Sequence, residues 1–440
     1  MSAIIFDFLG GKRIALLGFE REGRSSYTFL RKYFPERPLL IADWAQIELD
    51  DPRTTLLCGE NYLDVLHQCD LLLKSPGVSL RDVPLPPGLE ITCQTDLFLR
   101  FAPCVKAGVT GSKGKTTTST LLHAMLCASG LPARLIGNVG VPVLDSFDEI
   151  AGQIAVIELS SHQLEFTHAS PHVAVWTNLY EEHLDHYTGG FAGYAAAKAR
   201  ICQYQSPEDI FIFNADQPLD KQADISACRA RRIPIGLGEN NPFLRSLDNT
   251  NQRLRGEHNR QNIYFAAIAA LELGATHEGI RQAVVDFKGI PHRMCTVSGA
   301  GGIRWVDDCI ATIPQGVLHT VDALGDVDTL ILGGLDRGLG YHAFARALVA
   351  RPLRNIICMP ETGHSIAGLL KALSNQKNIV PVQTMEEAVE AGFALTAAGK
   401  TCLLSPAAAS YNAYKDFEEK GRHYLDCINN ISAARSPCPG

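Results

Sequence analysis

The sequence predicts an α/β protein of three domains, each built around a sheet of mainly parallel strands. Short β-type runs alternate with helix-like segments along almost the whole chain, and this alternation is typical of βαβ units. With 440 residues, the chain also exceeds the length that one ordinary hydrophobic core supports. We therefore expect a Rossmann-like domain over residues 1–103, a domain with a phosphate-binding loop over 104–290, and a second Rossmann-like domain over 291–440.

The first domain opens with three β-type runs, at residues 14–17, 39–42 and 71–73, each followed by a polar turn. The first run ends at Gly18 and leads into a helical segment. The second ends at Asp43, at the spacing where a dinucleotide-binding fold places an acid that binds ribose. Because the motif G-x-G-x-x-G is absent, a purely structural turn explains Gly18 equally well.

The second and third domains continue the same alternation. We expect strands of the second domain at residues 105–109, 154–157, 173–176 and 210–213, and of the third at 330–332, 356–358 and 402–404. A helix with an apolar stripe follows the first of these strands and should end near Gly130 and Pro132.

The composition excludes several classes of protein. The formal net charge of −7 gives no support to nucleic-acid binding, although glycine loops and helix N-termini bind phosphate groups without a basic surface. The first residues lack the pattern of a signal peptide, and no apolar run approaches the roughly 20 residues that span a bilayer. We expect a cytoplasmic protein that does not insert into membranes. The 13 cysteines are scattered singly, which argues against a disulfide framework and against a zinc site.

The strongest local signal is a glycine-rich loop between the first strand and helix of the second domain. Such a loop surrounds phosphate oxygens with backbone N–H groups, while Lys115 offsets charge and Thr116 can bind Mg²⁺. The strict P-loop spacing fails by one residue, because residue 109 is valine. The context still predicts an ATP site formed by Gly111, Ser112, Lys113, Gly114, Lys115, Thr116 and Thr117.

Other polar residues carry weaker signals. Glu158 ends an apolar run, so it either faces the ligand crevice and holds magnesium or is an ordinary strand-ending acid. His183 and His186 lie close together, which is only mildly suggestive of a metal. Lys198 has the local pattern of a solvated lysine on a helix.

Taken together, these motifs resemble the Mur ligases, ADP-forming enzymes that build the peptide of peptidoglycan. The order and spacing match over almost the whole chain. Segments 404–410 and 415–417 are similar to the C-terminal part of the glutamate-adding members. The residues that carry the resemblance are 110–117, Glu158, Asn178, Glu182, His183, Leu184, Asp185, Lys198, His258, Asn259, Asn262, His292, Arg293 and Asp308.

The resemblance implies roles for individual residues. Lys115, His183 and Lys198 match catalytic positions, and Lys198 matches the lysine that the family carbamylates. Two Mg²⁺ ions are implied, held by Thr116, Glu158, His183 and Lys198. Asn262, Arg293 and Asp308 match contacts to ATP. The UDP-sugar would contact Gly18, Asp43, Ser75, Pro76, Gly77, Asn138 and Ser161, and glutamate would contact Thr312, Arg337, Ser410 and Phe417.

The implied reaction adds glutamate to UDP-N-acetylmuramoyl-L-alanine through an acyl phosphate. Members that add D-glutamate carry lysines at the positions of Ile310 and Arg337. An isoleucine cannot pair with a carboxylate, and an arginine offers a different, forked geometry. Both segments resemble a minority branch that adds L-glutamate, with a separate epimerase acting afterwards. We therefore expect L-glutamate as the substrate.

Three alternatives stay open at this point. The chain could be a D-glutamate-adding ligase, a ligase similar to folylpolyglutamate synthase, or a nucleotide-binding homologue without activity. The N-terminal unit of about a hundred residues speaks against the folylpolyglutamate alternative, which needs no UDP-sugar domain. We expect a monomer.

Overall fold

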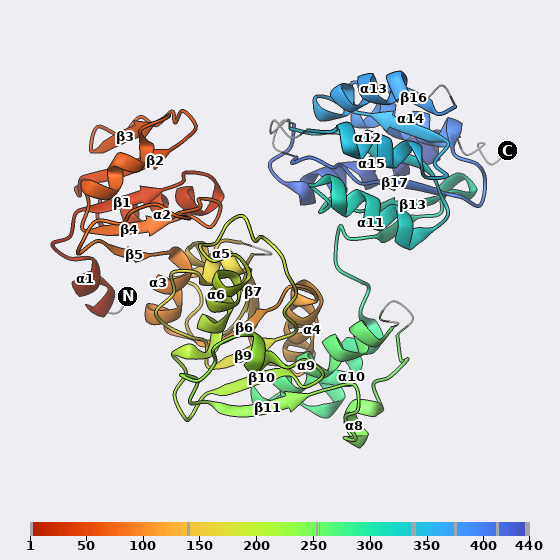
Figure 1. The fold of residues 1–440 in the computed structure, drawn as a ribbon. Helices are drawn as coiled ribbons and strands as arrows, with labels where there is room; N and C mark the ends of the chain where they lie inside the picture. Colours follow the sequence, from red (N-terminus) through yellow and green to blue (C-terminus); the bar gives the residue numbers. More distant parts are fainter. Residues whose placement is uncertain are drawn as a thin grey trace. The chain divides into compact units, whose positions relative to one another are not determined.

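The computed structural model describes residues 3–138, 141–251, 254, 256–335, 340–373, 376–410 and 413–435. The chain divides into two compact units, Met1–Phe287 and Lys288–Gly440. The described residues form three sheets, two in the first unit and one in the second (Figure 1). The predicted α/β class with three sheets is therefore confirmed.

The first sheet has five parallel strands in the order β3-β2-β1-β4-β5. The central strand β1 is buried along its whole length, because a parallel sheet is covered on both faces. Its carboxyl end lies next to that of β4, and this brings Gly18 and Ser75 together. The elements are α1 (Ala3–Leu9), β1 (Ile14–Leu17), α2 (Arg21–Tyr33), β2 (Leu39–Asp43), β3 (Thr54–Cys58), the 3₁₀ helix η1 (Tyr62–His67), β4 (Leu71–Lys74), β5 (Glu90–Thr92) and α3 (Gln94–Phe101).

The second sheet has six parallel strands in the order β11-β10-β9-β6-β8-β7. The chain leaves β6 toward β7 and β8 on one side and returns to β9 on the other, so the strand order reverses at β6. Ligands of open α/β sheets bind at the carboxyl ends of strands at such a point. The strands are β6 (Val105–Thr110), β7 (Ala133–Gly137), β8 (Ile154–Glu158), β9 (Val173–Trp176), β10 (Ile210–Asn214) and β11 (Arg231–Ile235).

Helices cover this second sheet and position the site. Helix α4 packs on α9 and α10, and α6 packs against β6 and β9 (Figure 1). The helix predicted to end near Gly130 is α4, which ends at Ala128. The helical elements are α4 (Lys115–Ala128), η2 (Val143–Ser146), α5 (Ser161–Leu164), α6 (Phe191–Gln203), α7 (Leu219–Gln222), α8 (Pro242–Arg245), α9 (Glu257–Glu272) and α10 (His277–Asp286).

The second unit holds a six-stranded sheet in the order β12-β13-β17-β14-β15-β16, in which only the β12–β13 pair is antiparallel. Apolar clusters pack on this sheet, one including Leu330 and Phe344 and another including Trp305 and Tyr424. The elements are β12 (Cys295–Ser298), η4 (Ala300–Gly302), β13 (Arg304–Asp307), α11 (Pro314–Leu324), β14 (Val327–Leu332), α12 (His342–Val349), β15 (Asn355–Cys358), α13 (Thr362–Leu373), β16 (Asn378–Pro381), α14 (Met385–Leu395), β17 (Thr401–Leu404) and α15 (Phe417–Arg435).

The strands expected from the sequence all form, with bounds that differ by three residues at most. The domain boundaries at residues 103 and 290 stay predictions, whereas the two compact units part between Phe287 and Lys288. Among the described residues, no helix is both long and apolar enough to cross a membrane.

Candidate functional site

The glycine loop lies between β6 and α4, at the point where the strand order reverses. Gly114 precedes α4 with φ +85°, and a Cβ there would lie 2.4 Å from Asn262 Oδ1. Gly111 has φ +152°, and its Cβ would lie 2.0 Å from Thr177 Oγ1. Only glycine fits both positions, so the loop depends on these two residues to curl tightly.

The end of β9 holds this loop in place. Thr177 Oγ1 donates to Lys113 O at 2.6 Å, and Lys113 N donates to Asn178 Oδ1 at 2.7 Å. The hydroxyl groups of Ser112 and Tyr194 share a hydrogen bond of 2.8 Å. A loop fixed by side chains from two other segments presents its backbone N–H groups without further ordering, which favours anion binding.

The N-terminus of α4 points its positive end at the loop. Lys115 Nζ donates to Gly111 O at 2.8 Å and to Ser112 O at 3.0 Å, so its ammonium lies against the loop. Thr116 is buried next to it. The structure thus brings the predicted loop residues together in the arrangement that binds phosphate groups at helix N-termini.

Glu158 lies beside the loop at the end of β8, where it pairs in register with Val109 of β6. Its side chain is 1% exposed. Oε1 accepts a hydrogen bond from Asn138 Nδ2 at 2.7 Å, whereas Oε2 has no hydrogen-bond partner among the described residues. Leaving a buried carboxylate oxygen unpaired is costly, and a divalent cation with oxygen ligands satisfies it. The site therefore fits Mg²⁺.

Lys198 reaches the same place from α6 and is not a solvated lysine. Its side chain is 1% exposed, and Nζ donates to Gly111 O at 2.9 Å. Burial, and after it the nearby Lys115 ammonium, lowers the pKa of Lys198 well below its usual value. Its amine is therefore neutral far more readily than that of an exposed lysine.

His183 stands in the loop before α6 with φ +55°, a conformation uncommon for histidine. Its ring centroid lies 4.8 Å from that of His162 and 6.3 Å from that of Tyr194. Burial lowers the pKa of His183, and a neutral imidazole is the form that binds metal ions.

Sequence reasoning missed the residues that surround the loop carrying His183. The His162 ring lies 4.2 Å from that of His186, and burial lowers the pKa of His162 to about 3. Glu165 pairs with His186 Nε2 at 3.4 Å and with the buried Lys74 at 3.1 Å. Lys74 ends β4 of the first sheet, so no local pattern could join it to residues some 90 positions away.

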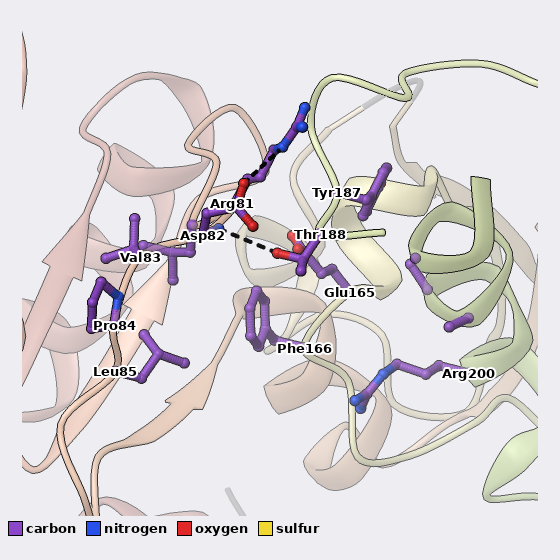
Figure 2. Close-up of a pocket in the computed structure, with 14 residues that line it drawn as sticks. Arg81, Asp82, Val83, Pro84, Leu85, Glu165, Phe166, Tyr187, Thr188 and Arg200 are labelled. Atoms are coloured by element: carbon purple, nitrogen blue, oxygen red, sulfur yellow. Dashed lines mark hydrogen bonds and ion pairs between the residues drawn. The ribbon is translucent and has the colours of Figure 1, made fainter. Parts of the chain in front are cut away.

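A pocket of about 540 Å³ adjoins the loop that carries His183 and lies between segment 80–85 and α6 (Figure 2). Ser79 Oγ donates to His186 O at 2.7 Å, and Asp82 N donates to Thr188 Oγ1 at 3.2 Å. The labelled Phe166 and Arg200 turn toward the pocket (Figure 2). These contacts connect the loop after β4 with the loop that carries His183.

The residues predicted to bind the UDP-sugar lie at the carboxyl ends of strands. Ser75 Oγ donates to Gly18 O at 2.8 Å, and Pro76 and Gly77 continue that turn. Asp43 accepts hydrogen bonds from Phe19 N at 2.6 Å and from Ala45 N at 2.8 Å. Asp43 Oδ2 thus holds the turn after Gly18, whereas Oδ1 bonds to the segment that follows β2, and the contact of Asp43 with ribose stays a prediction.

Asn138 and Ser161 flank Glu158. Asn138 is exposed. Its side chain donates to Glu158 Oε1, and its backbone N donates to Glu158 O at 3.0 Å. Ser161 is buried at the start of α5. Their contact with the UDP-sugar stays a prediction.

The predicted ATP contacts divide between the two units. Asn262 on α9 accepts a hydrogen bond from Thr118 Oγ1 at 3.3 Å, next to the phosphate loop. In the second unit, Arg293 is exposed. Asp308 is 2% exposed, and it accepts hydrogen bonds from Thr320 Oγ1 at 2.7 Å and Ser405 Oγ at 2.8 Å. The Asp308 carboxylate thus joins helix α11 to the end of β17, and burial raises its pKa. Its contact with ATP stays a prediction.

The predicted glutamate contacts belong to the second unit. Ser410 is buried, and its hydroxyl has no partner within the described part of the chain. Phe417 begins α15 and is half-buried, as are Thr312 and Ile310. Arg337 lies outside the described residues.

One buried cation of the second unit escaped the sequence analysis. Lys420 on α15 is 1% exposed, and its Nζ donates to Gly333 O at 2.7 Å. Burial lowers the pKa of Lys420 to about 8. Its neighbours in sequence are charged, so the local pattern predicts a solvent-exposed side chain. Lys420 is buried because the turn after β14 packs against it.

Comparison with known proteins gives a consistent result. The model of the Mur ligase middle domain matches residues 109–271. A UDP-N-acetylmuramoylalanine--D-glutamate ligase of Symbiobacterium thermophilum is 34% identical over 404 residues, 86% of this chain and 88% of that protein. The enzyme of the same name from Shouchella clausii is 32% identical over 96% of this chain and 97% of its own length. The solved UDP-N-acetylmuramate-alanine ligase MurC of Thermotoga maritima shares the fold, with a TM-score of 0.53 and 17% identity over 96% of this chain and 100% of that chain.

Proposed function

The chain belongs to the Mur ligase family, and on that premise we propose that it joins glutamate to UDP-N-acetylmuramoyl-L-alanine. Membership makes it an ATP-dependent ligase of peptidoglycan synthesis that forms ADP. The observation that carries the proposal is the meeting of a glycine loop, an unpaired buried carboxylate oxygen and a buried lysine at the carboxyl ends of β6 and β8.

ATP phosphates would bind the loop and the N-terminus of α4. Lys115, whose ammonium lies against the loop, would offset the charge of the transferring phosphoryl group. Thr116 and Glu158 would hold one Mg²⁺, and His183 with Lys198 a second. When bound, the ions would reduce the electrostatic repulsion between the attacking carboxylate and the triphosphate.

Carbamylation would turn Lys198 into a ligand for that second ion. A neutral amine is the form that attacks CO₂: a nitrogen–carbon bond forms as one carbon–oxygen π bond breaks, the nitrogen releases a proton to water, and an anionic carbamate results. A carbamate oxygen is a donor that Mg²⁺ accepts, whereas an ammonium is not.

The reaction would proceed in two displacements. The alanine carboxylate attacks the γ-phosphorus, which yields ADP and an acyl phosphate. The glutamate amine then attacks the acyl carbon and displaces inorganic phosphate. Asn138 and Ser161 would orient the alanine end, while Gly18 and Ser75 would bind the nucleotide end. A monomeric state and a cytoplasmic location are part of the proposal.

The enantiomer of glutamate has two candidates. Two relatives, whose matches cover 86% and 96% of this chain, are named D-glutamate ligases. These names favour D-glutamate over the L-glutamate predicted from the sequence. D-glutamate is therefore the first candidate. L-glutamate is the second, because Ile310 and Arg337 replace the two lysines expected in D-adding members. Only this second candidate requires an epimerase.

The test is ADP release with UDP-N-acetylmuramoyl-L-alanine and each glutamate enantiomer in turn. A preference for D-glutamate supports the first candidate. A preference for L-glutamate of at least about tenfold in kcat/KM, or 1.4 kcal/mol, supports the second. In that case Ile310→Lys should reduce the preference, while Ile313→Lys, at a side chain 53% exposed, should leave it unchanged.

ADP release that does not depend on the acceptor would contradict the ligase proposal. No release at all with an intact phosphate loop would favour an inactive nucleotide-binding homologue. Release with a folate acceptor in place of the UDP-sugar would favour a folylpolyglutamate synthase.

A further inference from the structure

Three side chains of metal-binding type meet on two helices of the second unit. Glu386 lies in the first turn of α14, and His423 and Cys427 lie on α15. One ligand atom of each lies within 4.8 Å of the other two, and His423 Nε2 is 3.0 Å from Glu386 Oε1. His423 and Cys427 are four residues apart, so they project from the same face of the helix.

The positions of these donors are set by packed helices. Helices α14 and α15 pack on one another, and Met385, Tyr424 and Ile428 are buried in one apolar cluster with Cys427. The first turn of α14 is capped by Thr384, whose side chain accepts a hydrogen bond from Glu387 N at 3.2 Å. The three side chains therefore stand on packed helices, so that an ion would bind to ligands that are already in position.

A fourth side chain orients the imidazole. Tyr414 OH lies 3.0 Å from His423 Nδ1, on the opposite side of the ring from Glu386. Without an ion, Nε2–H can donate to Glu386 Oε1. In the other tautomer, Nδ1–H donates to the Tyr414 oxygen and the lone pair of Nε2 faces the cluster, where it can bind an ion. Histidines that bind metals are commonly held in this way by a hydrogen bond at the other nitrogen.

The donor set indicates which ion would bind. A thiol, an imidazole and a carboxylate suit Zn²⁺ and similar borderline ions, whereas Mg²⁺ and Ca²⁺ prefer oxygen alone. The side chains of His423 and Glu386 are 37% and 56% exposed, so water can reach a fourth position. No zinc pattern is visible along the chain, because one ligand comes from a separate helix.

The simpler explanation is an exposed ion pair next to a buried cysteine. An exposed pair contributes little to stability, and it requires neither the thiol nor the Tyr414 contact. The geometry instead brings the thiol, the imidazole and the carboxylate together, with one ligand atom of each within 4.8 Å of the other two. Metal binding would displace the thiol proton.

We propose that Glu386, His423 and Cys427 bind one zinc-like divalent ion, with Tyr414 positioning His423, and that this ion links α14 to α15. The site is separate from the phosphate loop and does not depend on the function proposed above. The ion would also restrain Tyr414, whose backbone N donates to Ser410 O at 3.0 Å.

The test is titration of the full chain with Co²⁺ as a spectroscopic probe and with Zn²⁺ as competitor. We expect one Co²⁺ with a thiolate-to-metal absorption band, which Zn²⁺ abolishes. A cobalt ion at an oxygen-ligand magnesium site gives no such band. We also expect Zn²⁺ to raise the Tm of the wild type.

Cys427→Ser should abolish the band, and Glu386→Gln and His423→Gln should each weaken Co²⁺ binding at least tenfold. The last two side chains are partly exposed, so these variants remain informative even if Cys427→Ser fails to fold. The matched control is Cys127→Ser, since Cys127 Sγ lies 3.5 Å from His123 Nε2 in the same four-residue pairing on α4. A band that persists in Cys427→Ser or disappears in Cys127→Ser, or no band at all, would overturn the proposal.

Discussion

Replacing Gly114 by alanine tests whether the phosphate loop works as the structure indicates. Gly114 has φ +85° and a Cβ would lie 2.4 Å from Asn262 Oδ1. Gly130, beyond the other end of α4, has φ +76° and nothing within 4 Å of an added Cβ. The two glycines share the same backbone strain on substitution, and only Gly114 adds a collision at the site. Gly130→Ala is therefore the matched control.

The expected magnitudes follow from these geometries. A non-glycine residue in the left-handed region costs about 1–2 kcal/mol, which is the whole effect expected for Gly130→Ala. In Gly114→Ala, Asn262 must also move and lose the hydrogen bond from Thr118, 3.3 Å long and worth about 1 kcal/mol. We expect the free energy of unfolding to fall by about 2–3 kcal/mol in that variant.

Binding separates the two variants more clearly than stability. Calorimetric titration with ATP and Mg²⁺ should show affinity at least about tenfold weaker, or 1.4 kcal/mol, in Gly114→Ala and unchanged in Gly130→Ala. Denaturant unfolding measures the stability difference in parallel. Equal ATP affinities for the two variants would refute the reasoning, because the collision with Asn262 would then have no consequence for the loop.

Three buried charged side chains give further predictions. Lys198→Ala should lose nearly all ADP release and regain part of it with added acetate, which can occupy the place of the carbamate; a fully active variant would count against the assignment. Glu158→Gln should raise the Mg²⁺ concentration needed for half-maximal activity by at least about tenfold without lowering stability, because an unpaired buried charge is removed. For Lys420, the folded pKa of about 8 lies below the usual 10.5, so the unfolded chain binds more protons between these values. The free energy of unfolding of the wild type minus that of Lys420→Met should therefore rise by up to about 3 kcal/mol from pH 8 to pH 10.5. If this difference does not change with pH, the prediction is wrong.

The sheets show where sequence reasoning reached its limit. The strands that were predicted are interior strands, such as β1 and β14, whose continuous apolar runs reflect burial on both faces. All six edge strands, β3, β5, β7, β11, β12 and β16, were missed, together with the interior β13. Edge strands such as β11 and β16 are largely exposed, so their residues need no apolar pattern.

The conformation of the glycine loop was predictable because its requirements are local, and its binding of phosphate stays a prediction. Glycines at 111 and 114 permit the backbone conformation, and the lysine and threonine that follow stand at the start of the same helix. Glu158 and His183 needed the family resemblance as well, since a strand-ending acid and a loop histidine have no distinctive local pattern. The enantiomer predicted from Ile310 is the point on which the named relatives favour the alternative.

What the sequence determined by itself is therefore the α/β class, the interior strands other than β13 and the conformation of the glycine loop, all of which depend on residues close together in the chain. Tertiary structure alone decided which charged side chains are buried. Lys198 and Lys420 look like surface lysines until β6 and the turn after β14 pack over them. It also brought Glu386 to His423 and Cys427 from a separate helix. Burial and the meeting of donors depend on contacts between distant segments, and those contacts are made only when the chain folds.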